Sequence, residues 1–231
     1  MPAKRKELKS SKVYAALKEM ISDSRFQPGA RLNVEKLARE FRLSRIPVWE
    51  AARRLEQEGL LQTIPNRGVF MAEMTLERAF ELFLVRGALE RLAGRLAAEK
   101  MDKRTLAKTE KCLFRQLKAV EKGDLIGYSQ SDYEFHSLIY HSTGNRTLEE
   151  MLESVKTKMQ PVGLQVGPIL IDLYEDHRTI FEGLRKKDPE RVERAFQGHN
   201  QRVLKRIIAE IQASQKRRKG IKDFQKSLRP F

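Results

Sequence analysis

The stretch from Ser44 to Gly68, SRIPVWEAARRLEQEGLLQTIPNRG, constrains the fold more than any other part of the chain, because it predicts a helix followed directly by a tight hairpin. Ser44 precedes the helix and can cap it by accepting a hydrogen bond from a first-turn amide. Pro47 fits the first turn, where amides have no partner within the helix. The apolar residues that follow fall on one helical face: Val48, Ala51, Ala52 and Leu55.

The hairpin begins after Gly59, a residue suited to the left-handed position that ends many helices. Two short strands, 60–64 and 69–72, can pair around the turn Pro65-Asn66-Arg67-Gly68. Because the helix carries basic residues near its start, it can enter the major groove of DNA while the arginine at the hairpin tip touches the neighbouring minor groove. The alternative is an ordinary surface helix and hairpin whose charges are solvated.

This stretch, extended backwards over LNVEKLAREFRL and the turn QPGARL, resembles the winged helix-turn-helix of the GntR family of bacterial transcriptional regulators, in particular its FadR-type branch. The residues that match the family pattern are Pro28, Gly29, Leu32, Leu37, Ala38, Ser44, Arg45, Pro47, Val48, Glu50, Ala51, Leu55, Gly59, Leu60, Asn66 and Gly68. Two positions depart from it. Ile46 stands where threonine is frequent, and Trp49 stands where the family places a base-reading arginine.

The resemblance implies that the helix and hairpin bind double-stranded DNA. The expected contact residues are Lys36, Ser44, Arg45, Trp49, Arg53, Asn66, Arg67 and Gly68. Arg45 would contact bases, the hairpin residues would contact the minor groove or the backbone, and Lys36 and Arg53 would neutralise phosphates. Trp49 has two interpretations. Its ring packs against a thymine methyl or a sugar, which would give an unusual operator, or it serves packing only and Arg45 alone reads bases.

Length, charge and cysteine content are consistent with a DNA-binding protein of the cytoplasm. A chain of 231 residues suggests two modest domains. The net charge of +15 is concentrated at the two ends, which favours a nucleic-acid partner for the ends. A single cysteine, Cys112, excludes an internal disulfide framework and suits a reducing compartment. No apolar run is long enough to span a membrane, and no apolar signal-peptide segment follows the basic N-terminus.

Hydrophobic periodicity predicts a mostly α protein in three parts. Residues 1–74 are expected to form the winged helix-turn-helix, with three helices and a β-hairpin. Residues 75–214 are expected to form an all-α antiparallel bundle of six helices, large enough to enclose a pocket. The family resemblance implies that this bundle is the effector-binding, metal-binding and dimerisation domain. Residues 215–231 form a basic tail, either a disordered solubilising segment or a contact to DNA phosphates or a partner subunit. Within the first part, the expected segments before the hairpin helix are a mobile arm over 1–9, a helix over 10–24 and a helix over 33–42.

Three of the four histidines fall on apolar faces of different helices of the expected bundle. Asp132 and His136 are four residues apart, so they project from one helical face and can hold one ion. His177 and His199 each lie in an apolar stripe of a later helix. A lone buried histidine is ordinarily a hydrogen-bonded core residue. Three inward imidazoles and an inward carboxylate, however, would all be satisfied by a single cation.

The segments that carry these residues, SDYEFHSLIYHSTGN and EDHRTIFEGLRKKDPERVERAFQGHN, resemble the metal site of the FCD effector domain of FadR-type regulators. The resemblance implies that Asp132, His136, His177 and His199 are the ligands of a divalent metal ion. His141 does not fit the pattern and is expected at the surface. Three imidazoles and a carboxylate suit zinc, nickel, manganese or iron, and the sequence does not choose among them.

Arg86 shares a helical stripe with Leu82, Leu89 and Ala93, so its guanidinium is expected to face the interior of the bundle and to need a carboxylate. In the family, the corresponding segment supplies an arginine to the effector pocket. The resemblance therefore implies that Arg86 binds the carboxylate of a small organic acid. The alternative is an internal salt bridge with a glutamate of this chain.

Together these features predict a homodimeric regulator, not an enzyme, that binds a palindromic operator and changes its affinity when a small organic acid binds at the metal. One alternative is a metalloenzyme with an appended DNA-binding module, because an open histidine site can activate water. No separate general base and no second catalytic motif support that alternative. Another is a regulator whose metal is purely structural. The sequence does not identify the effector, the operator, the metal or the sign of regulation.

Overall fold

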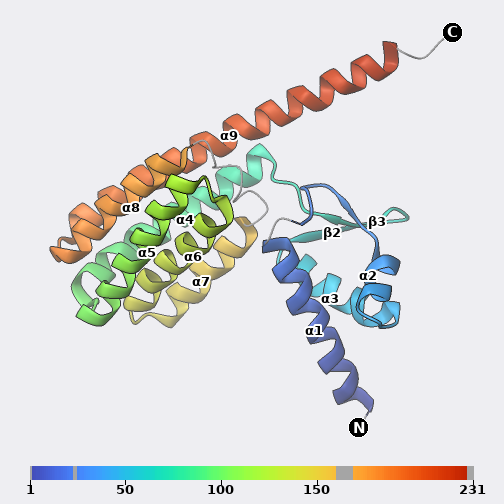
Figure 1. Cartoon of the computed structure of the whole chain (residues 1–231), viewed down its shortest axis with the longest axis horizontal. Helices are drawn as coiled ribbons and strands as arrows, with labels where there is room; N and C mark the ends of the chain where they lie inside the picture. The colour runs from blue at the N-terminus through green and yellow to red at the C-terminus, as the bar shows by residue number, and fades with distance from the viewer. Residues whose placement is uncertain (1, 23–24, 160–168, 228–231) are drawn as a thin grey trace. The chain divides into compact units, whose positions relative to one another are not determined.

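The computed structural model describes residues 2–22, 25–159 and 169–227, and its elements are helices α1–α9 and one small sheet (Figure 1). The chain divides into two compact units. The first is built on the chain up to Met74 and includes the end of α7 from Glu153, and the second holds residues 75–152 and the chain from α8 onwards. The predicted fold class, a mostly α chain with a hairpin near the N-terminus and helices thereafter, is confirmed.

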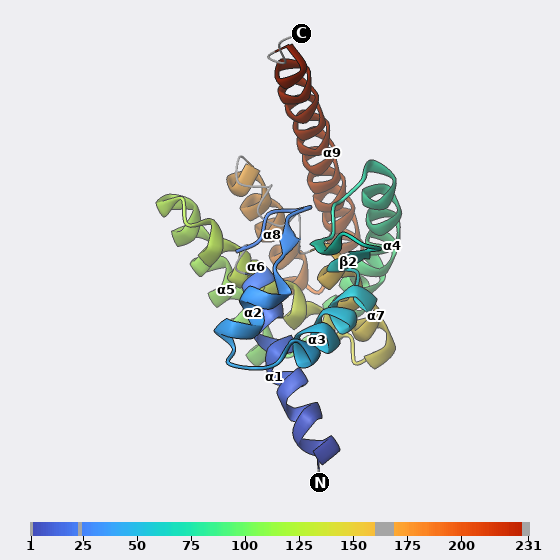
Figure 2. The ribbon, with the colours of Figure 1, turned by 90° about the vertical axis from the view of Figure 1, so that its right-hand side faces the viewer.

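The N-terminal unit combines three helices with a short antiparallel sheet. Its elements are α1 (Pro2–Ser22), β1 (Arg31–Leu32), α2 (Val34–Glu40), α3 (Arg45–Gln57), β2 (Leu61–Ile64) and β3 (Gly68–Met71). The strand order is β1-β3-β2, so a two-residue strand from the segment QPGARL extends the predicted hairpin. Figure 2 shows α3 beside α1 and α2, which hold it in place.

Helix α3 is anchored along the apolar face that its periodicity predicted. Its buried side chains share one core with α1: Val48, Ala51, Ala52 and Leu55 with Val13, Leu17 and Ile21. At the end of α3, Glu58 accepts hydrogen bonds from Lys18 of α1 at 2.8 Å and from the hydroxyl of Tyr14. Gly59 then adopts a φ of +76°, which confirms the predicted left-handed residue after the helix.

Two local predictions about this unit are wrong. Helix α1 begins at Pro2, so the segment 2–9, expected to be a mobile arm, is helical, as its lysines and glutamate allow. Ser44 has the extended backbone of a capping residue, but its hydroxyl makes no capping hydrogen bond, because backbone preference does not fix the side-chain rotamer. The predicted end of the first helix at Ser24 lies outside the described residues.

In the C-terminal unit, all regular secondary structure among the described residues is helical. Its helices are α4 (Leu76–Lys100), α5 (Lys103–Lys122), α6 (Leu125–Ser142), α7 (Arg146–Met159, whose end belongs to the first unit), α8 (Leu170–Arg185) and α9 (Pro189–Ser227). These are the six helices predicted after residue 75. Helix α9 packs along α4 and α8, and α5 packs along α6 and α8 (Figure 1). This arrangement brings the inward faces of α4, α5, α6, α8 and α9 to one core.

The helix boundaries in this unit follow the polar and glycine residues of the sequence. Asp102, Asp124 and Asp188 each accept a hydrogen bond from the backbone N–H three residues further on, at 2.6, 2.9 and 2.9 Å. Gly123 ends α5 with a φ of +63°. These caps keep successive helices short enough to fold back on one another, which positions the inward side chains.

Helix α9 continues to Ser227, so the prediction that the last helix ends near Ser214 is wrong. The lysine, arginine and glutamine residues of the extension are good helix formers and carry the helix past the end of the apolar pattern. Ion pairs stabilise the beginning of this extension. Oε2 of Glu210 lies 3.1 Å from Nη2 of Arg206, and Oε1 of Glu210 lies 2.7 Å from Nη2 of Arg217. The basic segment predicted as a tail is therefore a continuation of α9 up to Ser227, and residues 228–231 lie outside the described part.

Candidate metal centre and nucleic-acid interface

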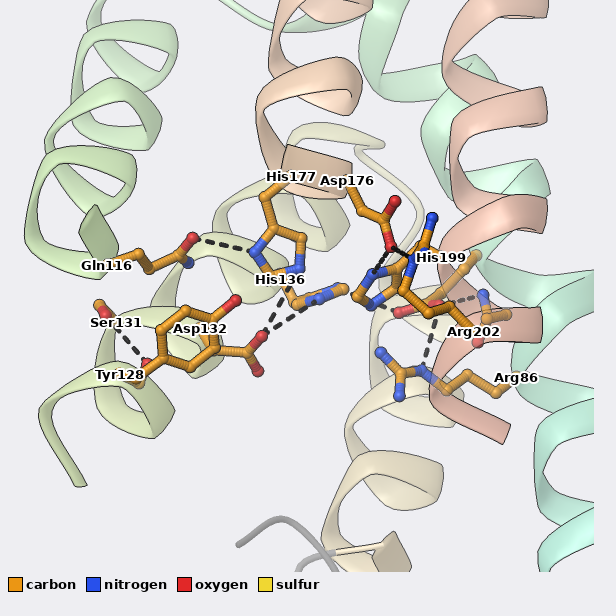
Figure 3. A network of polar contacts seen from close by, with 12 residues as sticks. Arg86, Gln116, Tyr128, Ser131, Asp132, His136, Asp176, His177, His199 and Arg202 are labelled. Atoms are coloured by element: carbon orange, nitrogen blue, oxygen red, sulfur yellow. Dashed lines mark hydrogen bonds and ion pairs between the residues drawn. The ribbon is translucent and has the colours of Figure 1, made fainter. Parts of the chain in front are cut away.

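Three histidines from three helices converge in the interior of the C-terminal unit. His136 on α6, His177 on α8 and His199 on α9 are all buried, and each offers a ring nitrogen within 4.8 Å of those of the other two (Figure 3). Asp132, one turn before His136, joins them: its Oδ1 lies 3.8 Å from Nε2 of His136 and 3.6 Å from Nε2 of His177. The structure thus brings together all four residues that the sequence singled out as ligands.

Two ring nitrogens of this cluster have no hydrogen-bond partner among the described residues. Nε2 of His136 and Nε2 of His177 are buried and unpaired. Leaving buried polar atoms unpaired costs free energy, and such atoms in a native fold call for a missing partner. Three convergent imidazoles with a carboxylate beside them are the ligand set of a divalent transition metal. The residues present therefore fit a metal ion.

The outer nitrogen of each imidazole faces an oxygen. Nδ1 of His136 lies 3.0 Å from Oε1 of Glu90, and Nδ1 of His177 lies 2.9 Å from Oε1 of Gln116. Nδ1 of His199 faces Asp176 at 3.6 Å, too far for a hydrogen bond. The oxygens of Glu90 and Gln116 accept hydrogen bonds, so they place the ring protons of His136 and His177 on Nδ1 and leave the Nε2 lone pairs of these two residues free for a metal.

Burial keeps the imidazoles of His136 and His177 neutral. The pKa of His177 lies well below its usual value because of burial and then because of the charges of His199 and His136. Burial also lowers the pKa of His136, although the Glu90 carboxylate opposes this shift. Neutral imidazole is the form that binds a metal, so the cluster is ready to do so at physiological pH.

Glu90 lies under the cluster as a fully buried carboxylate with four donors. Burial raises its pKa, but the charges of Arg86 and then His136 outweigh this, so the pKa of Glu90 lies well below its usual value. Nε of Arg86 is 3.1 Å from Oε2, Nδ2 of Asn200 is 2.6 Å from the same oxygen, and the hydroxyl of Tyr140 donates to Oε1. Glu90 is thereby held ionised and fixed in place.

Arg86 faces inward as predicted, and the carboxylate that it contacts is Glu90. This is the internal salt bridge kept as the alternative to an effector contact. The pair joins Nε of Arg86 to Oε2 of Glu90 (Figure 3). His141 lies at the surface as expected, with Nδ1 3.2 Å from Glu149.

The sequence interpretation missed the residues that contact the outer imidazole nitrogens: Glu90, Gln116 and Asp176. Two of them carried a usable signal. Glu90 follows Arg86 by four residues, the spacing of a helical ion pair, and Asp176 directly precedes His177. Gln116 carried none, because nothing in its own helix marks it as facing a histidine of α8.

The predicted DNA-contact residues lie on the exposed side of α3, at the hairpin tip and on α2. Ser44, Arg45, Arg53, Asn66, Arg67 and Lys36 are exposed, and Gly68 is partly so. Trp49 keeps 37% of its surface exposed, so its ring is not part of the core. Nη1 of Arg45 lies 3.0 Å from Glu35 on the surface, an ion pair that a phosphate or a base edge can displace. Asn66 takes a φ of +59°, which turns the chain at the hairpin tip.

None of the described helices combines the length and the apolar composition needed to cross a membrane.

Comparisons with known proteins match both units. Residues 9–71 match the family described as bacterial regulatory proteins, gntR family, and residues 81–202 match the FCD domain. The chain is 32% identical over 207 residues to the HTH-type transcriptional regulator YdhC of Bacillus subtilis, covering 85% of this chain and 91% of that protein. It is 27% identical to the HTH-type transcriptional repressor RspR of Escherichia coli, covering 86% and 88%. The solved structure of Escherichia coli McbR/YncC is similar with a TM-score of 0.78 at 26% identity, covering 87% of this chain and 98% of that chain.

Proposed function

Because the chain belongs to the gntR family of bacterial regulatory proteins and carries an FCD domain, we propose that it is a cytoplasmic, homodimeric regulator whose affinity for DNA is set by a small organic acid bound at a metal. It is a transcriptional regulator and not an enzyme, which removes the metalloenzyme alternative. What we propose beyond family membership is that the protein binds a metal and an organic acid, that it forms a homodimer, and that these properties control its binding to DNA.

Residues 1–74 are the proposed DNA-binding part. The exposed start of α3 enters the major groove, where Arg45 and Trp49 face base edges, and the β2–β3 tip reaches the neighbouring minor groove with Asn66, Arg67 and Gly68. Ser44, Lys36 and Arg53 would lie near the phosphate backbone of the DNA. The exposure of Trp49, next to Ile46 that is 58% exposed, supports contact of its ring with DNA over a packing role.

Residues 75–214 are the proposed sensing part. His136, His177, His199 and Asp132 would hold the metal, which could be zinc, nickel, manganese or iron. When bound, the metal supplies a Lewis-acidic position for a carboxylate oxygen. Arg86, anchored through Nε by Glu90, would present its terminal nitrogens to the same acid.

An exposed apolar stripe on α4 supports the homodimer. Phe80, Leu84 and Leu92 follow one another at multiples of four residues, and they are 55%, 78% and 47% exposed. Side chains this large and apolar are ordinarily covered, and a two-fold related copy of the same helix would cover them. A two-fold dimer in turn predicts a palindromic operator.

The observation that carries the proposal is the set of convergent buried imidazole nitrogens without partners beside Asp132. The test is binding of the full-length protein to a duplex obtained by binding-site selection, measured by fluorescence anisotropy with and without added metal and organic acids. An acid that acts as effector should change the affinity of metal-loaded wild type about fivefold or more, and should have no effect on His177→Ala.

Two results would count against it. If no acid shifts DNA binding and His177→Ala only lowers the melting temperature, the metal is structural. If the footprint covers a single unrepeated half-site, the dimer proposal fails.

A further inference from the structure

Helix α6 presents a stripe of side chains four residues apart: Tyr128, Asp132, His136 and Tyr140. Two tyrosines therefore flank the candidate metal ligands at equal spacing. The hydroxyl of Tyr140 donates to Glu90. The hydroxyl of Tyr128 has no hydrogen-bond partner, although the residue is only 2% exposed. The two tyrosine hydroxyls on this helical face therefore differ: that of Tyr140 has a hydrogen-bond partner within the protein, and that of Tyr128 has none among the described residues.

The Tyr128 hydroxyl is a hydrogen-bond donor beside the candidate metal site. Its ring lies nearly parallel to that of His177, at 16° between planes and 6.5 Å between centroids. Figure 3 shows its hydroxyl pointing toward Asp132 and His177. A phenol hydroxyl can donate one hydrogen bond. It therefore needs an acceptor that the described residues do not supply.

Gln116 offers a second unpaired donor next to the same imidazole. Its Oε1 accepts the proton of Nδ1 of His177 at 2.9 Å, and its Nε2 is left buried without a partner. Buried donors of this kind are rare in native folds, and each calls for an acceptor. Two such donors border the ring of His177, so they point to an oxygen atom that the described residues do not supply.

We propose that Tyr128 and Gln116 form a second subsite beside the metal, where they donate hydrogen bonds to an oxygen of the bound organic acid. This inference rests on the proposed function and narrows it. Besides the carboxylate that faces the metal and Arg86, the acid carries another oxygen group, such as a hydroxyl, a keto group or a second carboxylate. An acid with a single carboxylate leaves both donors unsatisfied.

The test compares acetate with malate, a hydroxy dicarboxylate, on full-length protein loaded with Co²⁺, whose visible spectrum reports ligands that reach the metal. The variants are Tyr128→Phe, which keeps the ring, and Gln116→Glu, which keeps the oxygen facing His177 but loses the donor. Tyr133→Phe, at an exposed site of the same helix, is the matched control. Competition with a chelator verifies that each variant still binds the metal.

Wild type should bind malate more tightly than acetate. Tyr128→Phe and Gln116→Glu should each lose about tenfold in malate affinity, the value of one hydrogen bond, while Tyr128→Phe keeps its acetate affinity and Tyr133→Phe matches wild type. Malate binding that is unchanged in both metal-loaded variants, or equal wild-type affinity for the two acids, would overturn the subsite and leave the proposed function standing. Failure of cobalt-loaded wild type to bind either acid would overturn both.

Discussion

Nδ1 of His136 lies 3.0 Å from Oε1 of Glu90, and this contact decides which face of the imidazole is available to a metal. An ionised carboxylate only accepts, so the ring proton is on Nδ1 and the lone pair of Nε2 points into the cluster. Glu90 is in turn fixed by Arg86, whose Nε is 3.1 Å from the other oxygen. The residue expected to bind the acid and a metal ligand are therefore joined through a single carboxylate.

Replacing Glu90 by glutamine should weaken metal binding and the fold together. The variant loses the charge that orients His136, so the affinity for Zn²⁺ in chelator competition should fall about 10–100-fold. It also leaves the guanidinium of Arg86 without its counter-charge, which should cost about 3 kcal/mol of unfolding free energy. Glu193→Gln, which breaks an exposed pair with Arg95 at 2.9 Å, is the control and should change stability by less than about 1 kcal/mol. Equal effects of the two substitutions would contradict the role of Glu90.

Replacing Trp49 by arginine should change the preferred operator. The ring is 37% exposed near the start of α3, the helix that we propose enters the major groove. Binding-site selection on wild type and Trp49→Arg checks this, and identical preferred sequences would exclude a reading role. Arg53→Gln is the matched comparison. Loss of a phosphate contact should weaken binding to all DNA sequences alike, and should reduce the slope of log affinity against log salt concentration by about one.

Two glycines of α4 should respond oppositely to alanine. A Cβ at Gly94 would lie 2.7 Å from atoms of both Phe196 and Val192 of α9, so Gly94→Ala should destabilise the protein by about 1–3 kcal/mol. A Cβ at Gly87 would meet nothing within 4 Å, so Gly87→Ala should stabilise it by about 0.5–1 kcal/mol through helix propensity. Urea unfolding of both variants measures the difference. A Gly94→Ala protein as stable as wild type would show that α4 and α9 do not approach this closely.

The pair that fixes α1 to the end of α3 should make stability depend on pH. Burial raises the pKa of Glu58, but hydrogen bonds from Lys18 and then Tyr14 outweigh it, so the pKa is lowered from its ordinary value of 4.5. Ionised Glu58 therefore stabilises the fold above pH 4.5, and this contribution disappears as the pH falls below that value. Glu58→Gln should lower the melting temperature at neutral pH, with a difference from wild type that shrinks towards about pH 3. If the difference in melting temperature between wild type and Glu58→Gln instead grew as the pH falls, the stabilising role of ionised Glu58 would be contradicted. Glu19→Gln, at an exposed site on α1, should have little effect at either pH.

The fold was largely predictable because its helices obey the apolar periodicity that burial imposes. The buried face of α3 and the caps at Asp102, Asp124 and Asp188 follow from residues within a few positions of each other. The start of α1 and the end of α9 could not be predicted in this way, because both helices extend past the apolar pattern on charged residues that favour helix. Whether the hydroxyl of Ser44 makes a capping hydrogen bond depends on its side-chain rotamer, which the local sequence does not determine.

The candidate site was predictable only in its inner layer. His136, His177 and His199 stand out because a histidine within an apolar stripe is conspicuous, and the four-residue spacing placed Asp132 on the same face as His136. The outer layer depends on contacts between helices far apart in the chain. Neither Gln116 facing His177 nor the unpaired hydroxyl of Tyr128 can be read from local sequence, since each is defined by what another helix does or does not supply.

The most direct test of the account is the metal content of the full-length protein, measured by elemental analysis after loading with Zn²⁺ and removal of free ion. Wild type and His141→Ala, which alters the exposed histidine, should each retain about one ion per chain, and His177→Ala should retain almost none. If wild type retains no metal, or if His177→Ala retains as much as His141→Ala, the buried histidine cluster is not a metal site and the proposed mode of regulation is wrong.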